Sequence, residues 1–344
     1  MSLKTTTKLG GTASHITVGK VAHGLMTMTM TTTASHAHSD EELFEAIKAG
    51  VDALPPGTKM VLNSAEFYGP HANRLANLEM LSRFYEANPG YADKTFLMVK
   101  GAMHFEQRRA DSSIEHLRKS VDACIAALRG TKKIDVFQSA RVDRSRPIEE
   151  SIRNFVVLKE EGKFEHIGLS ECKAETMRRA HAVHPIATVE IEVSIWSYEE
   201  ETKKVIAATR ELGIAVTGYS PLGRGFLTGQ INSLEDLPAD DWRRILTRFK
   251  EFDQNMASAK AIRAIAERKG VSPAQLAIAW VGQLGPHVLA LPGMSSKKRT
   301  LENLAGGDVV LTEAELAEVA EVMEKYPVQG DRYFGDDEAM GLWG

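Results

Sequence analysis

Short apolar runs alternate with amphipathic stretches along the chain, and this alternation predicts the fold. Near-continuous apolar runs rich in β-branched residues are typical of strands buried on both faces. The amphipathic stretches between them predict crossover helices, which make consecutive strands parallel. Eight such units favour a single (β/α)8 barrel domain of the α/β class over residues 1–344. The predicted strands cover residues 60–62, 95–99, 134–137, 166–169, 187–189, 214–217 and 288–291, with one more near 20–25.

Capping patterns mark where several helices should begin. A serine or threonine followed three residues later by Glu or Gln predicts a capping box. The pattern occurs at Ser39, Ser112, Ser272 and Thr312, so we expect helices to start there. The longest irregular stretch, 221–255, follows the seventh predicted strand, and long loops in compact domains are usually functional.

Polar residues directly follow the predicted strands. In a barrel the carboxyl ends of all strands meet at one rim, which is where active sites are built. The sequence therefore predicts that these residues gather around a common site. They are Asn63, Lys100, Gln138, Ser170, Glu190, Tyr219, Ser220, Gly293, Ser295 and Ser296.

Lys100 and Tyr68 are the sharpest candidates for chemistry. Lys100 directly follows the apolar run 96–99, so its stem starts inside or at the mouth of the barrel. A tyrosine with a pKa near ~10 is a poor acid at neutral pH unless a nearby cation stabilises its phenolate. A buried ammonium does this, and proton donation to a developing alkoxide becomes feasible.

Several segments, in order along nearly the whole chain, resemble the aldo-keto reductase family. The segment 62–69 ends in Phe-Tyr-Gly, and 218–225 reads Gly-Tyr-Ser-Pro-Leu-Gly-Arg-Gly. The resemblance implies an aldo-keto reductase barrel that uses NADPH or NADP+ to reduce an aldehyde or ketone. The other matching segments are 99–100, 134–138, 168–171, 291–296 and 302–303.

Carried over position by position, the resemblance assigns roles around the reacting centre. Tyr68 becomes the proton donor and Lys100 its activator, with Asn63 in support. Tyr219 would stack on the nicotinamide ring. The nicotinamide carboxamide would lie near Ser170, Glu171 and Glu190, and the pyrophosphate near Ser220, Leu222 and Arg224.

The resemblance also implies a preference for NADPH. Ser295, Ser296 and Arg299 would lie at the 2′-phosphate, and Glu302 and Asn303 at the adenine. Hydroxyls, backbone donors and an arginine suit a dianionic phosphate. The full implied cofactor set is Leu25, Met26, Asn63, Ser170, Glu171, Glu190, Tyr219, Ser220, Leu222, Gly223, Arg224, Gly293, Ser295, Ser296, Arg299, Glu302 and Asn303.

Two positions depart from the family pattern. The family's aspartate position is Asn63, which brings no charge, so we expect Lys100 to lack a counter-ion and to have a lowered pKa. The family's histidine position is Ala140, and His104 or Arg141 could substitute for it. The predicted substrate residues are Phe67, Tyr68, His104, Arg141 and Trp196.

The segment Phe-Gln-x-Ala-Arg-Val-Asp at 137–143, which lacks the histidine, together with Phe-Tyr-Gly at 67–69 and Val-Lys-Gly at 99–101, most resembles the fungal pyridoxal reductases. That similarity implies reduction of pyridoxal to pyridoxine. Two alternatives stay open: a reductase of other aldehydes or ketones, and an NADPH-binding regulatory subunit without significant catalysis. The aromatic residues Tyr333, Phe334 and Trp343 near the C-terminus either close over the substrate or pack on the flank of the barrel.

Composition excludes several classes of partner. The net charge of -4 gives no reason to expect nucleic acid, and no apolar run is long enough to cross a bilayer. Two cysteines, Cys124 and Cys172, form no disulfide framework. The pair His36 and His38 has no further metal ligand nearby in the sequence. We expect a cytoplasmic, metal-free enzyme that acts on a small aldehyde, with the oligomeric state open.

Overall fold

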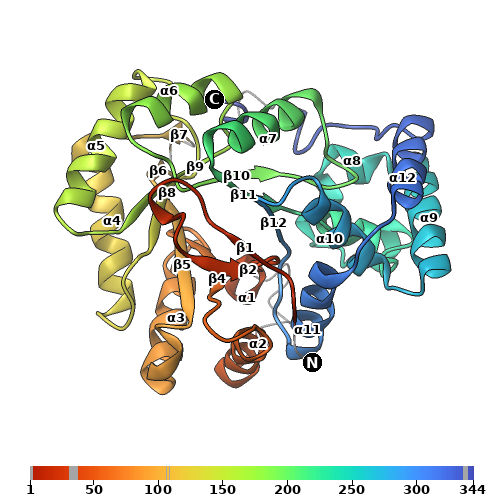
Figure 1. Ribbon diagram of the computed structural model, residues 1–344, viewed down its shortest axis with the longest axis horizontal. Helices are drawn as coiled ribbons and strands as arrows, with labels where there is room; N and C mark the ends of the chain where they lie inside the picture. The colour runs from red at the N-terminus through yellow and green to blue at the C-terminus, as the bar shows by residue number, and fades with distance from the viewer. Residues whose placement is uncertain (1–2, 31–37, 106, 108, 336–339) are drawn as a thin grey trace.

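A parallel barrel forms the centre of the computed structural model, which describes residues 3–30, 38–105, 107, 109–335 and 340–344. Within these residues an eight-stranded sheet has the order β12-β11-β10-β9-β8-β5-β4-β3 (Figure 1). Every neighbouring pair in this sheet is parallel, as predicted. The strands are β3 (His23–Gly24), β4 (Met60–Ala65), β5 (Thr95–Gly101), β8 (Val136–Ser139), β9 (His166–Ser170), β10 (Thr188–Glu192), β11 (Ala215–Tyr219) and β12 (Val288–Leu291).

The sheet closes between its first and last strands. Gly24 forms a parallel bridge with Gly293, and the amide of Ala22 donates a 2.8 Å hydrogen bond to the carbonyl of Ala290. The predicted (β/α)8 barrel is therefore confirmed. Its first strand is shorter than the predicted run 20–25, because only β3 joins the continuous ladder with β4.

Helices surround the barrel, and two more lie together on one flank (Figure 1). The surrounding helices bury their apolar faces against the strands in the large core cluster. Among the described residues, no helix is long and apolar enough to cross a membrane. The longer helices are α2 (Asp40–Asp52), α3 (Ala76–Ala87), α4 (Ile114–Leu128), α5 (Ile148–Glu160), α6 (Ala174–Val183), α7 (Glu200–Leu212), α10 (Pro273–Gln283) and α11 (Lys297–Ala305), with α9 (Phe252–Lys269) and α12 (Glu313–Lys325) on the flank.

Three of the four predicted capping boxes are present. Ser39, Ser272 and Thr312 each accept a hydrogen bond from the backbone three residues on, and the reciprocal bond is also made. The prediction for Ser112 is wrong, because Ser113 caps α4 instead. The backbone amide and hydroxyl of Ser112 donate to the carboxylate of Asp143, which ties this turn to the next loop.

Short helical turns fill most of the stretch 221–255 that was predicted as a functional loop. They are η4 (Gly223–Thr228), η5 (Leu234–Asp236), η6 (Trp242–Ile245) and α8 (Thr247–Lys250). Several of its side chains are fully buried, including Phe226 and Phe249. The stretch is therefore a packed part of the molecule beyond the seventh barrel strand.

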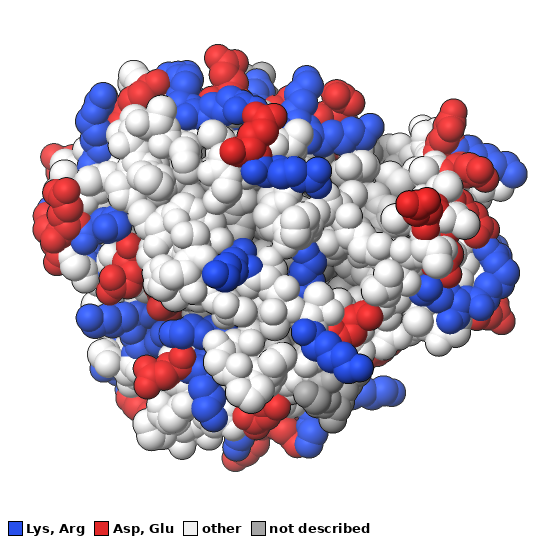
Figure 2. Space-filling view, viewed as in Figure 1, with Lys and Arg blue, Asp and Glu red and all other residues white. Residues whose placement is uncertain are grey.

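The inside of the barrel is a packed apolar core. Val61, Phe96, Met98 and Val136 belong to this inner cluster and are at most 1% exposed. The hairpin of β1 (Thr6–Lys8) and β2 (Thr17–Gly19), with the turn η1 (Gly11–Ala13) between them, adds Leu9, Ala13 and Val18 to the same cluster. The hairpin thus closes the amino-terminal end, which leaves the opposite rim for a site. On the face seen in Figure 2, acidic and basic side chains are interspersed around the periphery.

Candidate active site

A layer of polar side chains lies directly above the apolar core of the barrel. Side chains two residues apart on a strand point to the same face. Inward-facing Val61, Met98 and Val136 are therefore each followed, two residues later, by another inward-facing side chain. These followers are polar and at most 4% exposed. They are Asn63, Lys100 and Gln138.

Glu190 on β10 joins this layer together. Asn63 Nδ2 and Gln138 Nε2 each donate a 2.6 Å hydrogen bond to Glu190 Oε2. Lys100 Nζ lies 3.0 Å from Glu190 Oε1 and donates to Asn63 Oδ1 at 2.5 Å. The carboxylate is only 3% exposed, and all of its partners here are donors. A buried charge needs this kind of compensation, so the Glu190 carboxylate is well paired, whereas Gln138 Oε1 is buried without a hydrogen-bond partner among the described residues.

The expectation that Lys100 lacks a counter-ion is wrong. Asn63 is indeed uncharged, but the carboxylate of Glu190 reaches Lys100 from β10 instead of β4. Burial lowers the pKa of Lys100, whereas the charge of Glu190 and the phenol of Tyr68 raise it, and the net direction is upward. Lys100 is therefore held as an ammonium ion, the opposite of the expected effect.

Tyr68 lies over this ammonium ion. Lys100 Nζ is 4.9 Å from the centre of the Tyr68 ring. Burial raises the pKa of Tyr68, and the positive charge of Lys100 opposes that rise. The Tyr68 carbonyl accepts a 2.6 Å hydrogen bond from the hydroxyl of Thr29, which helps to position the residue after β4. The structure brings the predicted pair together.

Three residues of the predicted cofactor site have a left-handed backbone conformation. Glu171, Ser220 and Arg224 have φ values of 53°, 54° and 56°. Residues other than glycine rarely adopt such values, and they cluster at functional sites. All three lie at or just beyond the carboxyl ends of β9 and β11, on the rim that carries Tyr68.

The amino terminus of α11 fits a phosphate group. Ser296 caps this helix and accepts a hydrogen bond from the amide of Arg299, whose side chain is exposed in the first turn. Ser295 precedes the cap and is 6% exposed. Helix amino termini attract anions through free amide groups and the helix dipole. At the predicted pyrophosphate position, Arg224 Nη1 is buried and has no hydrogen-bond partner among the described residues, so it has a donor to offer.

The other predicted cofactor residues line the same rim. The amide of Leu25 donates to the carbonyl of Asn63 at 3.1 Å, and Met26 opens α1 (Met26–Thr29). Asn303, on α11, is 4% exposed. The remaining members are Ser170 at the end of β9, Leu222 and Gly223 at the start of η4, Gly293 after β12, and Glu302 on α11.

A segment near the C-terminus enters this rim. Arg332 is 2% exposed and donates to both carboxylate oxygens of Glu171, at 2.8 and 3.0 Å. It also donates to Glu192 at 3.0 Å and to the hydroxyl of Tyr219 at 2.8 Å. Closure of the aromatic residues over a substrate stays a prediction, and the contact of Arg332 with Tyr219 supports it.

Tyr333 extends the contact to the pyrophosphate position. Its hydroxyl is 3.2 Å from that of Tyr219, and the Arg224 guanidinium lies 4.3 Å from its ring centre. Arg224 also donates to Glu192 at 3.2 Å. Phe334, by contrast, is 50% exposed. The segment thus contacts residues predicted to hold the nicotinamide and the pyrophosphate.

The predicted substrate residues have different surroundings. The Phe67 ring meets Tyr68 edge-on, with the centres 5.5 Å apart. Arg141 donates to the carbonyl of Met340 at 2.9 Å, and Trp196 is 4% exposed and stacks on Phe226. The predicted residue His104 lies on β6 (Met103–His104), where it contacts Asp111 at 3.0 Å. Ala140 is buried, at 1% exposure.

Glu192 and Arg332 are site residues that the sequence reasoning missed. For Glu192 a signal existed: it lies two residues after Glu190, so both carboxylates face the barrel interior. Two acidic residues alternating with Ile191 and Val193 are unusual in a buried strand. For Arg332 there was no comparable signal, because nothing near it in sequence indicates that it reaches Glu171.

Comparisons with known proteins agree with this geometry. The model of the aldo/keto reductase family matches residues 20–324. A probable pyridoxal reductase 2 of Schizosaccharomyces pombe is 34% identical over 79% of this chain and 83% of its own length. Aldo-keto reductase str7 of Strobilurus tenacellus is 33% identical over 86% of this chain and 84% of its own. A probable aldo-keto reductase 1 of Glycine max is 35% identical over 79% of this chain and 78% of its own length.

A solved structure shares the fold. The glycerol dehydrogenase of Gluconobacter oxydans superposes with a TM-score of 0.76 at 24% identity, covering 95% of this chain and 97% of that one. The family match spans most of the chain, and the relatives exceed 30% identity over most of their length. This chain belongs to the aldo/keto reductase family, whose members reduce carbonyl compounds with NADH or NADPH.

Proposed function

We propose that this protein reduces pyridoxal to pyridoxine with NADPH, with Tyr68 as the proton donor. The observation that carries the catalytic part is the position of Lys100 Nζ, 4.9 Å from the Tyr68 ring and 3.0 Å from Glu190. A fixed ammonium ion beside a phenol stabilises the phenolate that remains after proton donation. The pair is therefore suited to protonating a carbonyl oxygen as it becomes an alkoxide.

The protein's own groups handle the proton in this reaction. NADPH, when bound, supplies the hydride that the aldehyde carbon accepts. The Tyr68 hydroxyl gives its proton to the aldehyde oxygen, which completes a primary alcohol. Lys100 holds positive charge next to the resulting phenolate, while Glu190 and Asn63 hold Lys100 in place. Solvent then restores the proton on Tyr68.

Two observations support the choice of pyridoxal. The chain is similar to a protein named probable pyridoxal reductase 2, at 34% identity. In addition, a small buried residue, Ala140, occupies the position where the family resemblance implies a histidine. Other relatives of similar identity carry only the family name, so substrate preference has to be measured directly.

A substrate panel combined with one variant tests the proposal. We expect kcat/KM for pyridoxal to exceed that for nitrobenzaldehyde and for simple ketones. Tyr68→Phe should lower kcat by roughly 10²- to 10⁴-fold, the usual contribution of general acid catalysis, while NADPH binding measured by fluorescence stays intact. A pyridoxal efficiency no better than that of nitrobenzaldehyde refutes the substrate, and unchanged turnover in Tyr68→Phe refutes the role of Tyr68. NADPH binding without turnover of any aldehyde would favour the regulatory alternative.

A further inference from the structure

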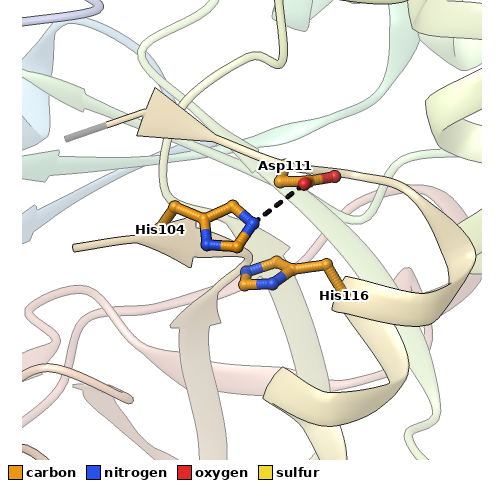
Figure 3. Close-up of side chains that lie close together, drawn as sticks. All are labelled: His104, Asp111 and His116. Atoms are coloured by element: carbon orange, nitrogen blue, oxygen red, sulfur yellow. Dashed lines mark hydrogen bonds and ion pairs between the residues drawn. The ribbon is translucent and has the colours of Figure 1, made fainter. Parts of the chain in front are cut away.

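Three potential metal ligands lie together outside the catalytic cluster. His104 ends β6, Asp111 directly follows β7 (Arg109–Ala110), and His116 lies in the first turn of α4. Figure 3 shows the two imidazole rings facing each other, with the Asp111 carboxylate beside His104. One ligating atom from each side chain lies within 4.8 Å of the other two. The spacing of these three residues in the sequence matches no metal-binding pattern, so only the fold brings them together.

The three side chains are held close together by direct contacts. His104 Nε2 is 3.0 Å from Asp111 Oδ2, and the ring centres of His104 and His116 are 3.9 Å apart. The other carboxylate oxygen, Asp111 Oδ1, accepts a 2.8 Å hydrogen bond from the amide of Ser113, which fixes its orientation. Such outer hydrogen bonds orient metal ligands in known sites.

His116 supplies an independent indication that this cluster binds a ligand. Its Nε2 atom is buried and has no hydrogen-bond partner among the residues that the structure describes. An unsatisfied buried polar atom costs free energy, and such atoms call for a specific explanation. A metal ion bound beside this nitrogen, in the plane of the His116 ring, would satisfy it.

We propose that His104, Asp111 and His116 bind a divalent transition-metal ion, with Zn²⁺ as the best chemical match. Two imidazoles and one carboxylate suit Zn²⁺, and three protein ligands leave a fourth position for water. The same set is a poor match for Mg²⁺ or Ca²⁺, which prefer all-oxygen ligands. The proposal is independent of the proposed function.

Two arginines limit the affinity of this site. Arg109 Nη1 is 3.6 Å from Asp111 Oδ2, and Arg146 Nη2 is 3.9 Å from Asp111 Oδ1. Their positive charges repel a cation, and Arg109 is held nearby by a 2.7 Å hydrogen bond from its Nε to Gln107 Oε1. We therefore expect reversible binding instead of a permanent structural ion.

Metal binding here would act close to the substrate side of the site. The ring of Phe105, next to His104, is 5.2 Å from that of Phe67, which in turn meets Tyr68 edge-on. An ion held by His104 and His116 would therefore tie the β6–β7 hairpin to α4 and brace this aromatic contact.

Titration of the full-length, chelator-treated protein tests the proposal. With Co²⁺ as a spectroscopic probe and Zn²⁺ in equilibrium dialysis, we expect one ion per chain and the visible bands of four-coordinate Co²⁺. His104→Ala and His116→Gln should abolish this binding, and Asp111→Asn should weaken it by about tenfold or more. His38→Ala is the matched control, because it disrupts a closely spaced histidine pair elsewhere in the sequence and should leave binding intact.

Thermal unfolding of each metal-free variant separates loss of ligands from loss of the fold. His104→Ala is the decisive variant, since its side chain is 35% exposed and its removal should leave the fold intact. Absence of binding to the parent protein overturns the proposal. So does retention of the ion by a folded His104→Ala protein, or loss of the ion in His38→Ala.

Discussion

At the level of single residues, the carboxylate that pairs with Lys100 is the most informative feature of the site. Glu190 reaches Lys100 from β10, while Asn63 on β4 contributes only hydrogen bonds. Because Asn63 and Glu190 contact each other directly, one negative charge can be moved between the two positions without changing the total charge of the cluster.

Exchanging that charge provides a direct test. We expect Glu190→Gln to lower kcat/KM by roughly 10- to 100-fold, because it leaves Lys100 buried without a counter-ion. Loss of the carboxylate also lowers the pKa of Lys100, so the alkaline limb of the pH profile of kcat/KM should move to lower pH. Adding Asn63→Asp restores the charge and should recover most of the activity. Equal activity of Glu190→Gln and the parent protein at every pH would contradict this role.

At the level of elements, we propose that the start of α11 is the part of the rim that distinguishes NADPH from NADH. Arg299→Ala should raise KM for NADPH by about tenfold, the effect of losing one charge-assisted hydrogen bond, and leave KM for NADH unchanged. Lys298→Ala, which changes an exposed residue of the same turn, is the comparison variant. Equal effects of Arg299→Ala on both cofactors would show that Arg299 does not bind the 2′-phosphate.

The segment around Arg332 is held to the barrel by buried charges. Arg332→Ala leaves Glu171 and Glu192 buried without their shared partner, so we expect the free energy of unfolding to fall by about 3 kcal/mol. Phe334→Ala, at an exposed position of the same segment, should change it by less than about 0.5 kcal/mol. Urea unfolding followed by circular dichroism measures both values. Similar stabilities for the two variants would mean that the Arg332 contacts contribute little.

At the level of the whole molecule, a buried histidine lies at the seam where the barrel closes. His23 lies on the first strand, and its Nε2 donates a 2.8 Å hydrogen bond to the carbonyl of Met294, just beyond the last strand. Burial lowers the pKa of His23 to about 4, although its hydrogen bond to Met294 opposes the shift. The folded barrel therefore disfavours a charged imidazole at its seam.

This pKa predicts acid sensitivity of the fold. Above pH 6.5 His23 is neutral in both folded and unfolded chains, so its stabilising contribution is complete. As the pH falls from 6.5 to about 4, His23 becomes protonated in the unfolded chain but stays neutral in the folded chain. The free energy of unfolding therefore falls by about 3 kcal/mol. The stability advantage of the parent protein over His23→Gln should shrink by that amount between pH 7 and pH 4 in urea unfolding. A difference that stays constant with pH would rule out His23 as the cause.

The sequence by itself determined the barrel, its rim and the pair of Tyr68 and Lys100. These follow from local information: apolar runs, capping residues such as Ser39, and polar residues placed directly after each strand. The capping pattern nevertheless predicted Ser112 as the cap of α4 where Ser113 is the cap. Ser112 instead donates its amide and hydroxyl hydrogens to Asp143, which belongs to a different loop.

Only the tertiary structure decided which charges meet. The contact of Lys100 with Glu190 crosses the barrel interior between residues 90 positions apart, and that of Arg332 with Glu171 joins residues 161 positions apart. The grouping of His104 with His116 depends likewise on how a short hairpin folds back onto a helix. A low-dielectric interior makes such pairs decisive for pKa and stability, yet a linear pattern carries no information on distances across the barrel.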